Sequence, residues 1–296
     1  MNLVKTIGMK PVKDFVKYVI YTGFVKNKPY PVSAMIIAPP EHAKSTVVEK
    51  FECLGVMQVD KATAYGLADI LNNMTEKERK IYHHFVILDL ENYASMGRVV
   101  KEQFIAFVKQ TTQEGMKKYH TAKIHLDLES RISYGFIMCT TPEDIGDKRS
   151  MFRSLAFLSR VVPFTYKYSD DMRREILNFV TEEEHNEKQR YIMDREEKKT
   201  ITLPRKYADQ LNILALVLAK RIENVSAHRK TIFTQSGNVD ELCGIRAKEE
   251  LATLLKAIAL YNGRDVVVQE DFDELRRLYK WMNFKFYDID KQHEDD

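Results

Sequence analysis

The chain has 296 residues, of which 44% are hydrophobic, so it can form one large domain or two modest ones around a substantial core. Lys and Arg total 46 against 43 Asp and Glu, and a net charge of +3 argues against a protein that coats nucleic acid, while leaving room for a local basic surface. The three cysteines are far apart and form no C-x-x-C pair, which argues against a disulfide framework or a zinc site.

The sequence shows no signal-peptide pattern and no apolar run near the ~18 residues that a membrane span requires. We therefore expect a cytoplasmic protein that does not enter a membrane.

The first predicted element is an amphipathic helix over residues 11–21, ending at Gly23 as a C-cap. Its apolar residues have the i, i+3, i+4 spacing of one buried face, and they are Val12, Phe15, Val16, Val19 and Ile20. A short apolar strand is predicted over 33–37, because prolines bound it on both sides.

Residues 38–45 read APPEHAKS, which has the spacing of the phosphate-binding loop G-x-x-x-x-G-K-[ST] with alanine in both glycine positions. In such a loop, backbone N–H groups surround a polyphosphate, the lysine reaches its terminal phosphates, and the neighbouring hydroxyl holds Mg²⁺. The predicted ATP-binding residues are Ala38, Pro39, Pro40, Glu41, His42, Ala43, Lys44, Ser45 and Thr46. By itself the segment is equally compatible with a strand that runs into a helix, because alanine adopts positive φ only at a cost.

A loop that leads into a short element is predicted at 63–67, and a second buried parallel strand within 83–91. The apolar run of this strand ends at Asp89, the candidate magnesium ligand together with Ser45. His83 and His84 precede the run without a third ligand at metal spacing, so we expect them at a solvated strand start.

A helix is predicted from about Met96 to 114, followed by a hairpin over 116–134, where apolar and polar residues alternate. A third buried strand over 135–141 ends in the hydroxyls of Thr140 and Thr141. Because parallel strands bring their carboxyl ends to one edge of a sheet, we expect Lys44, Asp89 and Thr141 to converge there.

In the order and spacing of these segments, residues 10–280 resemble the ATPases of the AAA+ superfamily, and most of all the minichromosome-maintenance (MCM) helicases and related helix-2-insert ATPases. The segments that carry the resemblance are Ala43-Lys44-Ser45, the helix before it, Thr63-Ala64-Tyr65-Gly66-Leu67, Thr141-Pro142, Leu158-Ser159-Arg160 and Gly244-Ile245-Arg246.

The resemblance implies a P-loop α/β core with a parallel sheet over 1–169, a helical lid over 170–290 that closes over the nucleotide, and a polar tail over 291–296. It also implies ATP hydrolysis in a homo-oligomeric ring such as a hexamer. Thr141 takes the place of sensor 1, Arg160 that of the arginine finger for a neighbouring subunit, and Arg246 that of sensor 2 at the nucleotide. The alternatives from the residues themselves are a surface arginine at 160 and a structural ion pair at 246.

Four departures from the family bear on its activity. Leu90 occupies the position of the glutamate that orients the attacking water, and Glu91 follows it. Glu91 can act only if the strand has already broken into a loop, since successive strand side chains point to opposite faces. Ala38 replaces a glycine and Thr141 an asparagine, and the N-terminal domain with which MCM proteins grip DNA is expected to be missing. The candidate catalytic residues are Asp89, Glu91, Thr141 and Arg160.

These features leave three functions open. The first is an ATP-driven DNA helicase or replication-initiation motor, with Lys117, Lys118 and Lys123 of the hairpin in contact with DNA. The second is a protein-remodelling ATPase of the MoxR type, favoured by the near-neutral charge. The third is a nucleotide-binding assembly module that does not hydrolyse ATP, favoured by Leu90 and Ala38.

Overall fold

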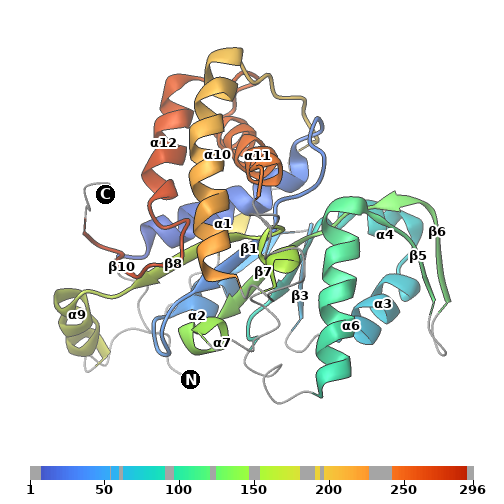
Figure 1. Cartoon of the computed structure of the whole chain (residues 1–296), viewed down its shortest axis with the longest axis horizontal. Coiled ribbons are helices and arrows are strands. Elements are labelled where there is room, and N and C mark those ends of the chain that lie inside the picture. The colour runs from blue at the N-terminus through green and yellow to red at the C-terminus, as the bar shows by residue number, and fades with distance from the viewer. Residues whose placement is uncertain are drawn as a thin grey trace, which may run out of the picture.

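The computed structural model describes residues 8–53, 55–59, 63–90, 97–120, 125–146, 154–180, 191–193, 197–226 and 242–291. Six parallel strands form one sheet flanked by helices, and the C-terminal part of the chain is mostly helical (Figure 1). The strands lie in the spatial order β10 (Tyr287–Asp288), β8 (Val162–Lys167), β1 (Ala34–Ile37), β7 (Gly135–Thr140), β4 (His84–Ile87) and β3 (Val56–Val59). The predicted class, a parallel α/β sheet flanked by helices and followed by a helical region, is confirmed at this level.

The central strands are buried on both faces, as expected for a parallel sheet covered by helices. This explains why the three predicted strands are continuous apolar runs rather than alternating ones. β10 was not expected in the sheet: the chain returns from its helical region to pair Tyr287 with Tyr166 of β8.

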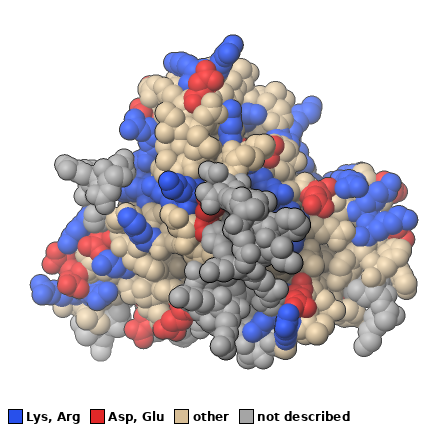
Figure 2. All heavy atoms as spheres, in the orientation of Figure 1, with Lys and Arg blue, Asp and Glu red and all other residues tan. Residues whose placement is uncertain are grey.

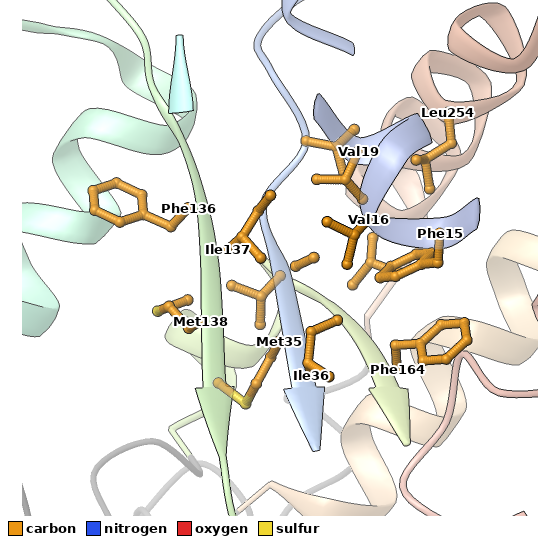
Figure 3. Close-up of a cluster of buried hydrophobic side chains, with 14 of the residues drawn as sticks. Phe15, Val16, Val19, Met35, Ile36, Phe136, Ile137, Met138, Phe164 and Leu254 are labelled. Atoms are coloured by element: carbon orange, nitrogen blue, oxygen red, sulfur yellow. The ribbon is translucent and has the colours of Figure 1, made fainter. Parts of the chain in front are cut away.

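Helix α1 (Lys10–Tyr21) covers one face of the sheet with the predicted apolar residues. Phe15 stacks on Phe164 of β8 with ring centroids 4.4 Å apart, and Val16 and Val19 lie between the sheet and Leu254 (Figure 3). The other side of α1 is buried as well, because the C-terminal helices pack on it. Arg277, for example, forms an ion pair of 2.7 Å with the largely buried Asp14.

The C-terminal helices α10 (Arg205–Val225), α11 (Ile245–Tyr261) and α12 (Gln269–Tyr279) stack over α1, whereas α9 (Asp170–Val180) lies near β8 and β10 (Figure 1). The lid over the nucleotide loop that the resemblance implies stays a prediction. The Lys199 carbonyl accepts a hydrogen bond of 2.7 Å from the Lys26 N–H, so the segment that leads into α10 contacts the chain just beyond the end of α1.

The remaining elements are η1 (Thr22–Phe24), α2 (Lys44–Glu49), β2 (Phe51–Cys53), α3 (Ala64–Asn73), α4 (Glu76–Ile81), α6 (Arg98–Lys109), η2 (Gln110–Glu114), β5 (Met116–His120), β6 (His125–Ile132), α7 (Pro142–Gly146), α8 (Leu155–Leu158) and β9 (Tyr191–Met193). The predicted hairpin is confirmed as β5 and β6. The loop predicted at 63–67 is wrong, because Thr63 caps α3 by accepting a hydrogen bond from Gly66 N–H. No helix among the described residues is long and apolar enough to cross a membrane.

The expected solvated strand start at His83 and His84 is also wrong, because both side chains are buried. Their Nδ1 atoms are 2.6 Å apart, and His84 Nε2 lies 3.0 Å from the Val32 carbonyl, which only accepts. His84 therefore donates from Nε2, and His83 donates from Nδ1 to His84. Gly23 is not the C-cap that the sequence predicted: its chain continues into η1, and a Cβ there would fall on the His83 ring.

This histidine pair predicts a fold that is sensitive to acid. Burial lowers the pKa of His83 well below its ordinary value and that of His84 to about 3. Near pH 6 the unfolded chain therefore takes up protons that the folded chain does not, and stability is lost as pH falls below about 6.5. From pH 7 to pH 5 we expect the free energy of unfolding to fall by about 2 kcal/mol per histidine.

Urea unfolding at several pH values measures this effect. The variant His84→Gln should lower the slope of the unfolding free energy against pH by the equivalent of about one proton. The variant His125→Gln, at an exposed position, should leave that slope unchanged. An equal slope in wild type and His84→Gln would contradict the prediction.

Candidate nucleotide site

The candidate site lies at the carboxyl edge of the sheet, where β1, β4 and β7 end. The loop 38–43 follows β1, Asp89 follows β4, and Thr141 follows β7. The Ser45 hydroxyl, at the start of α2, donates a hydrogen bond of 2.8 Å to the Leu88 carbonyl beside Asp89, which joins the start of α2 to the end of β4. This contact leaves the lone pairs of the Ser45 oxygen available to a cation.

Cys139 of β7 is fully buried near this edge. Burial raises the pKa of its thiol to about 12, the charge of Lys44 and a hydrogen bond with Ser45 lower the pKa, and the charge of Asp89 raises it. Sequence reasoning did not single out Cys139. A cation between Ser45 and Asp89 would meet a hydroxyl and a carboxylate, the hard oxygen ligands that Mg²⁺ prefers.

The loop has a backbone that alanine and glutamate rarely adopt. Ala43, in the second glycine position, has φ 53° and ψ 20°, and Glu41 has φ 64°. The left-handed conformation costs a non-glycine residue roughly 1 kcal/mol or more, and such residues gather at functional sites. At the start of the loop, Ala38 N–H donates to the Thr140 carbonyl at 3.4 Å, which joins it to β7.

Two tyrosines of the chain segment around the end of β8 contact the loop at His42. The Tyr166 hydroxyl donates a hydrogen bond of 2.7 Å to the His42 carbonyl, and the Tyr168 ring stacks on the imidazole with centroids 4.4 Å apart. Burial lowers the pKa of His42, so its ring is neutral at pH 7 and donates from Nδ1 to the Pro40 carbonyl at 2.8 Å. Neither tyrosine was predicted at the site.

Thr141 reaches the predicted edge, but its hydroxyl is already engaged. It donates to Asp144 Oδ2 at 3.0 Å, and the Thr140 hydroxyl donates to the same oxygen at 3.0 Å. Asp144 thus adds a carboxylate at the end of β7 that sequence reasoning missed. Its signal was the order Thr141-Pro142-Glu143-Asp144, with proline in the first helical turn and an acid shortly after it.

Two positions bear on the catalytic base, and the structure describes one of them. Leu90 is fully buried, and its N–H donates to the Cys139 carbonyl at 3.0 Å, so the position that the family gives to glutamate belongs to the core. Glu91 lies outside the described residues.

Arg160 and Arg246 are not brought to this edge. Arg160 directly precedes β8, whose Val162 N–H donates to the carbonyl of Ser33, before β1. Arg246 Nη1 donates to the neighbouring Ser159 hydroxyl at 3.0 Å. Both arginines therefore lie at the amino edge of the sheet. The length of strand β1, roughly 13 Å, separates this edge from the loop at the carboxyl edge. In one chain, Arg246 cannot serve as the predicted contact to nucleotide bound at the loop.

The surroundings of the two arginines are crowded and charged. Arg160 is buried, donates to the Ala156 carbonyl and lies 3.7 Å from exposed Glu114. Burial and then the charge of Arg246 lower its pKa. Glu250 of α11 is buried, burial raises the pKa of its carboxyl group, and the charges of Arg246 and Arg160 lower it. The cluster holds two guanidinium groups near one another on this side of the molecule.

On the predicted nucleic-acid hairpin, Lys117 and Lys118 are exposed on β5, and Lys123 lies outside the described residues. Lys118 forms an ion pair of 3.4 Å with Asp127 of β6, and both side chains are mostly exposed, so the pair contributes little to stability. Lys and Arg side chains, with acidic ones among them, mark this side of the surface (Figure 2). In the part of the chain that the structure describes, no three His, Cys, Asp or Glu side chains gather as a metal site.

Comparisons with protein-family models and with curated protein sequences find no match to this chain.

Proposed function

We propose that the chain is a P-loop ATPase of the AAA+ type that binds ATP with Mg²⁺ at the carboxyl edge of the sheet. The observation that carries the proposal is the 2.8 Å hydrogen bond from the Ser45 hydroxyl to the Leu88 carbonyl, which brings Lys44-Ser45 to the strand end that leads into Asp89, next to a loop with left-handed Ala43. Lys44 supplies the positive charge for the terminal phosphates, and Ser45 and Asp89 supply oxygen ligands for the cation.

A second copy of the chain completes the proposed hydrolytic site. Arg160 and Arg246 lie at the edge opposite to the loop, so they act on nucleotide held by a neighbour. An apolar stripe supports a contact on this side: Ile213, Leu216 and Val217 of α10 are large hydrophobic residues with exposed side chains. Ile245, directly before Arg246, is 62% exposed as well. A contact that joins one edge to the opposite edge is head-to-tail, and it closes into a ring when the rotation allows.

The proposed role is ATP-driven movement on DNA, with the β5–β6 hairpin as the DNA contact. The support is geometric: the hairpin projects from the side of the molecule (Figure 1), and Lys117 and Lys118 are exposed on it. Their contacts would be to phosphates, which position a strand without reading its sequence.

One observation favours a second candidate, a nucleotide-binding assembly module without hydrolysis. Leu90 is buried at the position that the family gives to the catalytic glutamate. ATP binding and ATP hydrolysis must therefore be measured separately.

The experiment that tests the motor is the ATPase rate with and without single-stranded DNA at two salt concentrations. We expect stimulation by DNA that weakens as salt rises, with a slope of about −0.7 in log affinity against log salt for each phosphate contact. The double variant Lys117→Ala, Lys118→Ala should weaken DNA binding about equally for all sequences. It should also make the salt slope less steep by the amount that about one to two phosphate contacts contribute.

The matched control is Lys26→Ala, which removes an exposed lysine outside the hairpin. A basal ATPase rate that DNA does not change at either salt concentration would favour a protein-remodelling ATPase. Nucleotide binding with no ATPase activity would favour the assembly module.

A further inference from the structure

The nucleotide loop of this chain has its shape without any glycine. Residues 38–45 contain two alanines and two prolines, yet Glu41 and Ala43 both have positive φ. Glycine adopts this conformation freely, whereas other residues keep it only when their surroundings impose it. Contacts from outside the loop must therefore hold these residues in place.

Such contacts meet at His42, the residue between the two left-handed positions. Its carbonyl accepts the Tyr166 hydroxyl at 2.7 Å, its Nδ1–H donates to the Pro40 carbonyl at 2.8 Å, and its ring stacks on Tyr168. The contacts of this one residue therefore hold the backbone on both of its sides.

Tyr166 is itself held rigidly. It is fully buried in β8, a strand that pairs directly with β1, and Ile37 and Thr165 are register partners in that ladder. Its hydroxyl therefore reaches the loop from the central sheet, past the end of the strand that leads into the loop. A group placed on a rigid element positions a site more exactly than a group on another loop does.

We propose that Tyr166 is a positioning residue for the polyphosphate, whose hydroxyl holds the loop in its binding shape through the His42 carbonyl. The proposal rests on the proposed function and adds how a loop without glycine is kept ready for its ligand. Its consequence is energetic: a loop that is ordered before binding loses less conformational freedom when the phosphates arrive.

The test uses Tyr166→Phe, which removes one oxygen and keeps the ring. Its matched control is Tyr134→Phe, because Tyr134 is equally buried and its hydroxyl also donates to a backbone carbonyl, that of Arg79, at 3.3 Å away from the loop. For both variants, thermal unfolding is measured first, and then the binding of Mg²⁺-ATP and of inorganic triphosphate by the full chain.

We expect both variants to unfold a few degrees earlier than wild type, as the loss of one buried hydrogen bond predicts. Only Tyr166→Phe should bind ATP and inorganic triphosphate more weakly, each by about five- to tenfold. Equal weakening for the two ligands is the signature of a positioned loop, because triphosphate lacks the base and sugar.

If wild type binds both ligands and Tyr166→Phe binds them equally tightly, the positioning role is overturned while the proposed function stands. Equal weakening in Tyr134→Phe would also overturn it, because the effect would then follow general stability. If wild type binds neither ligand, the proposed function and the positioning role fall together.

Discussion

The variant Lys44→Ala should bind Mg²⁺-ATP about 10- to 100-fold more weakly than wild type while it unfolds at nearly the same temperature. The loss corresponds to the charge-assisted hydrogen bonds that one ammonium group makes to phosphate oxygens. Stability should change little, because the Lys44 side chain is only partly buried and substitutions at such positions are usually small in effect. Isothermal titration calorimetry measures the binding, and circular dichroism on heating measures the fold.

The matched control for this variant is Lys220→Ala, which removes an exposed lysine on α10. It should bind Mg²⁺-ATP as wild type does. If Lys44→Ala keeps the wild-type affinity, the loop is not the phosphate site and the nucleotide must bind elsewhere or not at all.

Arg160→Ala should lower the ATPase rate by about 10³-fold and leave ATP binding nearly unchanged, since an arginine supplied by a neighbour stabilises charge only in the transition state. The position of Arg160 at the amino edge of the sheet is the reason: it lies on the far side of the sheet from the loop of its own chain. The rate of phosphate release and the ATP affinity are measured for the same preparation.

Mixing the two inactive variants separates action between copies from action within one copy. A Lys44→Ala copy still carries Arg160, and an Arg160→Ala copy still carries an intact loop, so part of the activity should return at mixed contacts. Arg221→Ala is the matched control, because its guanidinium also donates to backbone carbonyls, those of Tyr279 and Met282. The ring mechanism is wrong if mixing restores nothing, or if the wild-type rate per molecule stays constant on dilution to monomer.

The parts of the site that follow strand ends could be predicted from the sequence. The apolar runs that precede the loop to Lys44, Asp89 and Thr141 define buried parallel strands, and parallel strands bring their ends to one edge. The contact between Ser45 and Leu88 agrees with that argument. The roles of these residues toward ATP remain predictions.

The residues that sequence reasoning missed act through contacts that no local pattern encodes. Tyr166 looks like an ordinary core residue of β8, and only the path of the loop brings the His42 carbonyl to its hydroxyl. His83 and His84 look solvated at the start of a strand, but Gly23, Gly55 and Gly135 come from distant parts of the chain to make room for their rings.

The pairing of β10 with β8 has a consequence for the synthesis of the chain. Strands β8 and β1 are complete early, but the strand that covers the outer edge of β8 is made only after residues 168–286. At the ribosome this interval lasts on the order of ten seconds. During that time the outer edge of β8 presents unpaired backbone groups, so its neighbours in the cell meet an open sheet edge before the chain can close it.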